Sequence, residues 1–401
     1  MSSRHATVPA RSVEDHRQRI VNLFAPLADR GGEAVPMARA LGRRLTTDVY
    51  SPLDLPVFRN SAMDGYAVRA DSIATVPVTL PLAGVVAAGN TGAPTLPEGA
   101  ALKVMTGAPI PVGADCVVPV EHTAGTDGTV TIEKSRSAGD FIREAGTDVR
   151  TGQLLVAAGT VLKPRHIAAL AAVGLVELPV WRRVRAAVIT TGDELVQAGL
   201  SLLPGQIYNS NGIALAAALA DNGVEVVSVA HATDDPREFT RRLGEATATA
   251  DLVFTSGGVS MGDFEVVKDV LAPLGGEFGS VAIQPGGPQG LTVVDGVPVL
   301  SFPGNPVSTM VSFEVFARPL LRALAGLPEI AGVALPLRDS VRSPAGKRQF
   351  LRGRRTGDGV ELVAGPGSHL IATMAQADVL IEIPGEVTEV PAGTPLTTWE
   401  L

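Results

Sequence analysis

Asp251-Leu-Val-Phe-Thr-Ser-Gly-Gly-Val-Ser-Met-Gly-Asp-Phe-Glu-Val-Val-Lys268 is the stretch on which the fold of this 401-residue chain depends. Leu252–Phe254 is a short apolar run, the pattern of a strand buried on both faces, and Ser256-Gly-Gly258 then interrupts it. Asp263 is a good N-cap with apolar residues at helical spacing behind it, so we expect a helix from that point. A glycine loop before a helix N-terminus suits an anion, although a glycine turn without a ligand explains the same pattern.

Composition limits the classes of protein that the chain can belong to. Hydrophobic residues make up 45% and charged residues 18%, which indicates a globular protein of several domains. The net charge of −8 argues against nucleic acid as the main partner. The single cysteine, Cys116, excludes an internal disulfide and a cysteine-based metal cluster, and its apolar neighbours place it in a core. Met1–Arg30 has no apolar signal core and no segment is long enough to span a membrane, so we expect a cytoplasmic protein.

The order of the apolar patterns predicts the domain organisation. We expect helices at Ser12–Phe24, Ala34–Val49 and Lys163–Val173, with a β-rich region at Val76–Val149 between the last two. From Arg183 onward strands and helices alternate, which predicts a doubly wound α/β domain. Short apolar runs from Leu335 to Leu401 predict a small barrel or sandwich.

Polar residues follow four of the strands expected in the α/β domain. They are Asp193–Glu194, Asp234–Asp235, Ser256–Asp263 and Pro303–Ser308. Any one of these is an ordinary cap or turn, but the carboxyl ends of parallel strands meet at one edge of a sheet, so the four should converge. Glycine loops with Ser260, Asn305 and Ser308 suit phosphate oxygens, whereas Glu194, Asp234 and Glu265 would repel them unless Mg²⁺ lies between.

Two other segments carry polar residues that suit a site or, equally, a turn. Asp64 follows Asn60-Ser-Ala-Met63 and precedes Gly65, which is consistent with a carboxylate on a rigid loop and also with an Asx-type turn. Arg352 and Ser368 lie in the C-terminal region, where a surface arginine and a turn serine are the simpler interpretation.

Five motifs give the chain its resemblance to a known family. They are Asn60-Ser-Ala-Met-Asp-Gly-Tyr-Ala67, Met105-Thr-Gly-Ala-Pro109, Thr191-Gly-Asp-Glu194, Ser256-Gly-Gly-Val-Ser-Met-Gly262 and Pro303-Gly-Asn-Pro-Val-Ser308. In this order they resemble the molybdopterin molybdenumtransferases, the MoeA family, which is also similar to the C-terminal domain of gephyrin. The resemblance covers nearly the whole chain.

The resemblance implies a reaction and a set of site residues. Adenylylated molybdopterin and molybdate would give molybdenum cofactor and AMP, with Mg²⁺ or a similar divalent cation. Catalytic positions would be Asp64, Thr106, Asp148, Glu194 and Asp234, and metal ligands would be Glu194, Asp234 and Glu265. Substrate would bind at Ser256, Gly257, Gly258, Ser260, Pro303, Gly304, Asn305, Pro306 and Ser308, with Arg352 and Ser368 at molybdate.

The resemblance also implies an α/β multidomain architecture and an elongated homodimer. The doubly wound α/β/α domain would comprise residues 10–30 and 181–328, and an inserted β-rich domain residues 51–152. A small mixed linker and dimerisation domain would comprise 31–50 and 153–180, and a β-barrel-like domain 333–401. Other enzymes of molybdenum cofactor biosynthesis are further candidate partners, whereas nucleic acid and membrane are not.

Two departures from the family pattern leave alternatives open. Many members read Lys-Pro-Gly-Lys-Pro where this chain has Gln284-Pro-Gly-Gly-Pro288, so two cations are missing near the expected molybdate. We hypothesise that Arg352, with Lys347, Arg348 or His369, compensates. Glu265 stands where an Asp is common. The alternatives are a paralogue with altered or lost activity, such as one preferring tungstate, a molybdopterin adenylyltransferase, and a non-enzymatic scaffold.

Overall fold

The chain forms two compact units, each described here by itself. In the computed structural model, which describes residues 10–89, 92–260 and 265–401, the first unit is Met1–Glu33, Gly42–Arg44 and Trp181–Leu401. The second is Ala34–Leu41 and Leu45–Val180. Within the described ranges no helix is long and apolar enough to cross a membrane.

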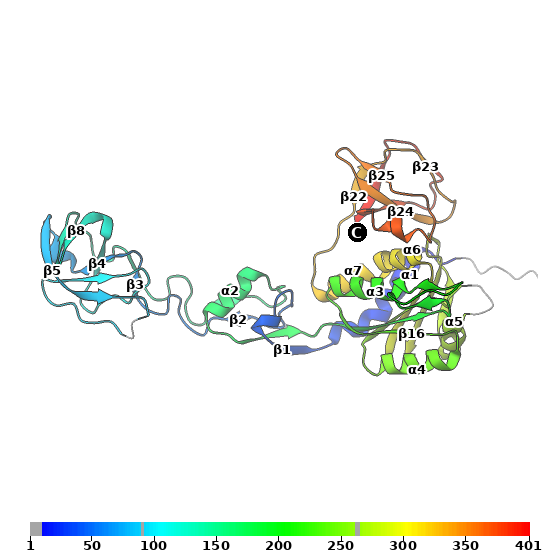
Figure 1. The fold of residues 1–401 in the computed structure, drawn as a ribbon, viewed down its shortest axis with the longest axis horizontal. Coiled ribbons are helices and arrows are strands. Elements are labelled where there is room, and N and C mark those ends of the chain that lie inside the picture. The colour runs from blue at the N-terminus through cyan, green and yellow to red at the C-terminus, as the bar shows by residue number, and fades with distance from the viewer. Residues whose placement is uncertain (1–9, 90–91, 261–264) are drawn as a thin grey trace, which may run out of the picture. The chain divides into compact units, whose positions relative to one another are not determined.

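A mixed six-stranded sheet is the centre of the first unit (Figure 1). Its strand order is β16 (Glu225–Ala232), β13 (Arg185–Thr191), β17 (Leu252–Ser256), β21 (Val297–Phe302), β20 (Pro288–Val294) and β18 (Glu277–Ser280). The first four strands are parallel, and β20 and β18 are antiparallel additions at one edge. The alternation predicted from Arg183 onward therefore produces the expected parallel sheet.

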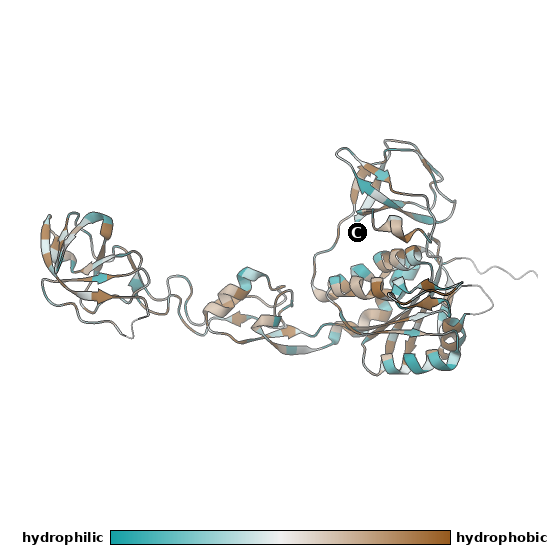
Figure 2. Ribbon diagram, in the orientation of Figure 1, coloured by the Kyte–Doolittle hydropathy of each residue, from teal (hydrophilic) through white to brown (hydrophobic). Residues whose placement is uncertain are grey.

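Helices cover both faces of this sheet because the buried strands present apolar side chains on alternate sides. Val253 packs with α4 (Pro236–Thr247) and α5 (Val266–Leu271), whereas its neighbour Phe254 packs with the helices of the opposite face. Those helices are α1 (Val13–Phe24), α3 (Ser210–Asp221), α6 (Pro306–Ser312) and α7 (Arg318–Ala325). In Figure 2 the apolar colour gathers on the strands between the two helical layers.

A second sheet follows in the same unit, built from the C-terminal region. Its order is β19 (Ile283–Gln284), β24 (Arg348–Arg355), β26 (Val379–Ile383), β28 (Pro395–Glu400) and β22 (Val333–Pro336), with β25 (Val360–Leu362) beside β24. Strand β19 comes from the α/β region of the chain and pairs in parallel with β24. The α/β region and the C-terminal region therefore share a sheet. Whether the C-terminal strands close into a barrel stays a prediction.

The second unit contains a six-stranded sheet and a smaller helical part. The sheet has the order β7 (Cys116–Pro119), β4 (Gly65–Val68), β6 (Ala101–Val104), β5 (Val78–Val86), β9 (Thr129–Ile132) and β8 (Thr123–Thr126). Cys116 is fully buried, as predicted, and burial raises the pKa of its thiol to about 12, so the thiol is not a nucleophile at neutral pH. The smaller part contains α2 (Pro164–Ala172), β2 (Val49–Tyr50) and β11 (Leu154–Val156).

Two of the predicted helices differ from those in the structure. The helix predicted over Ala34–Val49 is wrong, because the segment forms β1 (Gly32–Pro36) and one short 3₁₀ turn, Met37–Arg39. Pro36 and Gly42, whose φ is +73°, interrupt the apolar periodicity that suggested a helix. The helix expected from Asp263 begins at Val266, and Asp263 itself lies outside the described residues.

Candidate functional site

The loops that follow β17 and β21 meet at the carboxyl edge of the parallel sheet. The Gly257 amide donates to Phe302 O at 3.1 Å, and Gly304 approaches the Gly257 backbone. Gly257 has a φ of +103°, and a Cβ there would lie 2.8 Å from Thr191 O at the end of β13. Only glycine fits this position, because the two backbones approach so closely. The ends of the neighbouring strands β13, β17 and β21 therefore converge, as the sequence predicted.

A network of buried polar side chains holds these loops in place. Asn211, at the start of α3, donates to Ser256 Oγ at 2.9 Å and to Gly304 O at 2.8 Å. Ser256 Oγ is 3.1 Å from Thr309 Oγ1, and Thr309 donates to Pro303 O at 2.6 Å. Ser256 is 1% exposed and Thr309 fully buried, so these side chains fix the loops and leave loop backbone for a ligand.

The predicted substrate residues divide into buried and exposed groups. Ser256, Gly257, Pro303 and Ser308 are buried, and Gly258 and Pro306 are half-buried. Ser260, Gly304 and Asn305 are exposed at the edge of the sheet. The exposed group is therefore the one that a ligand reaches directly, and the ligand roles of all these residues stay predictions.

Two aspartates at neighbouring strand ends hold each other in place. The Asp234 amide donates to Asp193 Oδ1 at 3.0 Å, and the Asp193 amide lies 3.4 Å from Asp234 Oδ2. Glu194 follows Asp193 and is exposed, and its carboxylate lies beside Gly192. Glu265 accepts from the Ser260 amide at 2.8 Å.

The carboxylates at the strand ends are the candidate metal ligands of the first unit. Over the ranges that the structure describes, no group of three or more His, Cys, Asp or Glu side chains is arranged to hold a metal ion. Glu194, Asp234 and Glu265 do not form a ready-made cage. Mg²⁺ is commonly held by one or two carboxylates together with substrate phosphates and water, and Asp193 with Asp234 supplies a pair of that kind.

Arg352, on β24, is a buried cation near the same loops. It is 3% exposed and donates to Gly365 O and to Gly367 O, the latter at 3.0 Å. Burial alone lowers the pKa of its guanidinium. Ser368, the next residue of that loop, accepts from the Val307 amide at 3.0 Å, which joins the loop to the start of α6. Arg348, proposed as a helper, is instead engaged with Glu14 and Glu382.

In the second unit the structure brings Asp64 and Thr106 together. Asp64 Oδ1 accepts from the Thr106 amide at 2.6 Å and from its hydroxyl at 2.9 Å. These two bonds lower the pKa of the Asp64 carboxyl, which therefore stays ionised at neutral pH. Both side chains are exposed. Asp148 is also exposed, and its amide donates to Leu55 O at 2.9 Å, but no described contact links it to Asp64.

Two functional candidates were missed by sequence reasoning. Asn211 was not predicted, although its segment Asn209-Ser-Asn211 opens α3, and Asn209 caps that helix through the Gly212 amide at 3.2 Å. Asp193 was placed after a strand but was not chosen as a ligand. An asparagine cluster at a helix start is the signal that could have identified Asn211.

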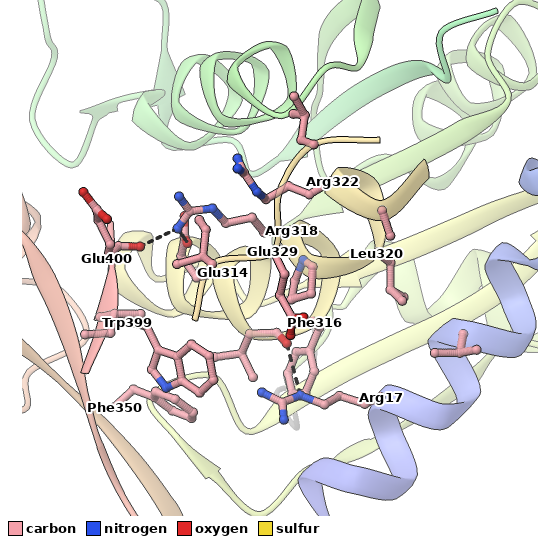
Figure 3. Close-up of a pocket in the computed structure, with 17 residues that line it drawn as sticks. Arg17, Glu314, Phe316, Arg318, Leu320, Arg322, Glu329, Phe350, Trp399 and Glu400 are labelled. Atoms are coloured by element: carbon pink, nitrogen blue, oxygen red, sulfur yellow. Dashed lines mark hydrogen bonds and ion pairs between the residues drawn. The ribbon is translucent and has the colours of Figure 1, made fainter. Parts of the chain in front are cut away.

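A sizeable cavity in the first unit is separate from the strand-end loops. It has a volume of about 430 Å³ and lies among α1, α7 and the C-terminal sheet. Phe316, Phe350 and Trp399 form its aromatic wall, and Arg17 and Arg318 reach into it from the two helical segments (Figure 3). None of the predicted site residues lines it.

Comparison with known proteins identifies the class of protein that this fold and site define. Models of the MoeA N-terminal region (domain I and II), a probable molybdopterin-binding domain and the MoeA C-terminal region (domain IV) match residues 11–174, 187–323 and 334–401. The chain therefore belongs to the MoeA family.

Individual relatives extend over the same length. The chain is 44% identical to molybdopterin molybdenumtransferase 2 of Mycobacterium tuberculosis, covering 98% of this chain and 100% of the relative. It is 35% identical to the molybdopterin molybdenumtransferase of Nostoc sp., over 99% and 95% of the two chains. A crystal structure of a molybdopterin biosynthesis MoeA protein from Pyrococcus horikoshii, 33% identical, superposes with a TM-score of 0.80 over 98% and 99% of the chains.

Proposed function

We infer that this chain is a molybdopterin molybdenumtransferase, which transfers molybdenum from molybdate to adenylylated molybdopterin and releases AMP. The observation that carries the inference is the match over the full length of relatives bearing that name. The strand-end loops support it, because exposed backbone at Gly304 and Asn305 stands on a rigid polar network. Rigid donors aimed at a charged group are what a phosphate-bearing substrate requires.

The chain's own residues have distinct parts in this reaction. The loops after β17 and β21 hold the substrate's phosphate through backbone amides, and Ser260 and Asn305 add polar side chains. Arg352 holds a positive charge where burial keeps water away, which favours binding of the molybdate dianion. Asp64 stays ionised and is an electrostatic or positioning group rather than a proton donor.

We include Mg²⁺ or a similar divalent cation in the proposal. Asp193 and Asp234 form a carboxylate pair at neighbouring strand ends, and Glu194 lies beside it. Bound there, the cation would neutralise the phosphate linkage. The role of Glu265 as a third ligand is part of the same proposal.

We also propose a homodimer. Large apolar side chains are exposed in the segment that follows β14 (Leu195–Val196) and in the first turn of α3, and these are Leu200, Leu202, Leu203, Ile207, Tyr208 and Ile213. A patch of this kind is typical of an interface. Leu203→Glu should convert a dimer to a monomer in light scattering after size exclusion, and a wild-type monomer would contradict the proposal. The cytoplasmic location remains an expectation of the same proposal.

AMP release from adenylylated molybdopterin, with Mg²⁺ and with or without molybdate, tests the function. Molybdate-dependent release with molybdenum retained on the pterin supports it. Release that depends on tungstate only, or binding of the pterin without release, would contradict it.

Arg352→Leu should raise the molybdate concentration needed for half-maximal rate by about tenfold, because one charge-assisted contact is lost. Arg355→Leu, on an exposed part of β24, is the control and should not change it.

A further inference from the structure

Arg352 of β24 is a buried cation for which the chain supplies no negative charge. It is 3% exposed, and burial is the only influence on the pKa of its guanidinium. In the part of the chain that the structure describes, no carboxylate forms an ion pair with it. Arg348, on the same strand, pairs with Glu14 and with Glu382. A buried charge without a counter-charge is costly, so Arg352 would gain from an anion that the chain itself does not provide.

Neutral carbonyl groups of one loop stand where that counter-charge would be. Arg352 donates from Nη1 to Gly367 O at 3.0 Å and from Nη2 to Gly365 O. Its Nε is buried and has no hydrogen-bond partner among the described residues. The guanidinium therefore has its terminal nitrogens on backbone carbonyls and one buried donor, Nε, unused.

The loop that carries these carbonyls is held by few bonds. We call residues 364–368, which follow β25, the strap. Gly365 and Pro366 are exposed, and a Cβ added at Gly365 would have no atom within 4 Å. Within the described ranges, the strap is joined to other elements by the two bonds from Arg352 and by one from the Val307 amide to Ser368 O, at 3.0 Å. A segment with so few bonds opens locally at low cost.

The two terminal nitrogens of Arg352 are the donors that an oxyanion would need. A guanidinium group presents its N–H donors in a planar fork, which two oxygens of one anion accept together. In the structure Gly365 O and Gly367 O accept from that fork. An anion would bring the negative charge that the carbonyls lack, and its bonds would be about twice as strong as neutral ones. An oxyanion and the strap therefore compete for the same donors.

We propose that the strap is an autoinhibitory contact. Gly365 O and Gly367 O cover the donors of Arg352, and a tetrahedral oxyanion binds Arg352 by displacing them. The inference rests on the proposed function in one respect, which is that it takes molybdate as the anion. The buried Nε supplies a further donor once the anion is in place. Arg352 is thereby reserved for an anion whose charge outweighs the cost of opening the strap.

Displacement of the strap has a direct readout at the start of α6. The Val307 amide belongs to the first turn of this helix, where amides have no acceptor within the helix, and it donates to Ser368 O instead. When the strap leaves, this amide loses its acceptor and exchanges with solvent. Hydrogen exchange of Val307 therefore reports whether the strap is closed.

Hydrogen exchange of the full-length protein, with sodium molybdate alone as the probe, tests the opening. Molybdate should speed exchange of the Val307 amide about tenfold, the effect of losing one hydrogen bond, and sodium chloride at the same ionic strength should not. In Arg352→Leu the strap has lost its anchor, so exchange should be fast with and without molybdate. Calorimetry on the same samples shows whether molybdate binds.

A variant outside the set of anion donors tests the competition. Pro366→Gly loosens the strap without touching Arg352, because glycine raises the entropy of the open loop. The Kd for molybdate should therefore fall about threefold, since less free energy is needed to open the strap. Pro391→Gly, at another exposed proline of the C-terminal region, is the control and should leave the Kd unchanged.

Three results would overturn the proposal. One is molybdate binding, seen by calorimetry, with no change in Val307 exchange. Another is no binding of molybdate to the wild type at up to about 10 mM. The third is an equal change of Kd in Pro366→Gly and Pro391→Gly. Molybdate-dependent AMP release with any of these results would refute the strap and leave the proposed function standing. Opening of the strap by molybdate without AMP release would refute the proposed function alone.

Discussion

The strand-end loops of the α/β domain and the Asp64–Thr106 pair of the second unit use polar residues in opposite ways. In the α/β domain, Asn211, Ser256 and Thr309 are buried and bond to one another and to loop carbonyls. In the second unit, Asp64 and Thr106 are exposed and bond chiefly to each other. Buried polar groups stabilise a scaffold because an unpaired one is costly, whereas exposed groups remain accessible to a substrate.

Asp64 also shows that a local bonding pattern does not identify a catalytic residue. Asp54 accepts from the Thr151 amide at 2.7 Å and from its hydroxyl at 2.8 Å, which is the arrangement that Asp64 makes with Thr106. Asp54 belongs to none of the family motifs. The two pairs therefore offer a matched comparison within one unit.

The largest effect should come from removing the charge of the exposed pair. Asp64→Asn should lower the rate of molybdate-dependent AMP release on the order of 100-fold, because it removes an ionised group from the site. The unfolding midpoint should hardly change, since the side chain is exposed. Steady-state AMP release and thermal unfolding on the same preparation check this. A large fall in the midpoint would show that Asp64 is structural.

A substitution in the buried network should act on stability first. Asn211→Leu leaves Ser256 Oγ and Gly304 O without the amide donor, so we expect a loss of about 2 kcal/mol in the free energy of unfolding. Urea denaturation measures it. Thr240→Val, which removes one exposed hydroxyl bond on α4, is the control and should stay within about 0.5 kcal/mol. Equal losses of unfolding free energy in the two variants would contradict the structural role assigned to the buried network.

The buried His16 of the first unit predicts that stability depends on pH. Burial, then Arg11 and Arg19, lower the pKa of His16 from 6.5 to about 3. Below pH 6.5 His16 binds a proton in the unfolded chain but stays neutral in the folded chain. The contribution of His16 to the free energy of unfolding is therefore complete above pH 6.5 and is lost as the pH falls toward 3.

His16→Phe isolates this contribution from the carboxylates. Between pH 6.5 and 5.5 the variant should lose about 1 kcal/mol less unfolding free energy than the wild type. Urea denaturation at the two pH values measures the difference. Parallel pH profiles for the two proteins would contradict the prediction, because they would mean that His16 has the same pKa in the folded and unfolded states.

The smallest effect should come from the matched exposed pair. Asp54→Asn removes the carboxylate charge from an arrangement like that of Asp64, and AMP release should change by less than about twofold because no motif places Asp54 at the site. A loss comparable to that of Asp64→Asn would show that the assay reports the folding of the second unit rather than the site.

Much of the fold followed from local patterns. The strand at Leu252–Phe254, which the structure extends to Ser256, the glycine loop and the parallel sheet were predicted because apolar runs and glycines act through neighbouring residues. The helix over Ala34–Val49 failed for the complementary reason. Its apolar residues belong to the small core around Leu45 and Leu170, where short strands and turns bury them without a helix.

The site was predicted in part. Sequence order placed polar residues at the ends of neighbouring strands, and the contact between Gly257 and Phe302 confirms that the loops meet there. It did not separate the scaffold from the residues that face solvent. Asn211 was missed because its partners, Ser256 and Gly304, lie 45 and 93 residues away.

The sequence by itself therefore determined where strands, loops and helices alternate, and which family the motifs resemble. Only the tertiary structure decided that Ser256 is a buried support while Asp64, paired with a threonine 42 residues away, is exposed. The physical reason is that secondary-structure periodicity depends on near neighbours, whereas burial depends on which distant segments pack against a residue.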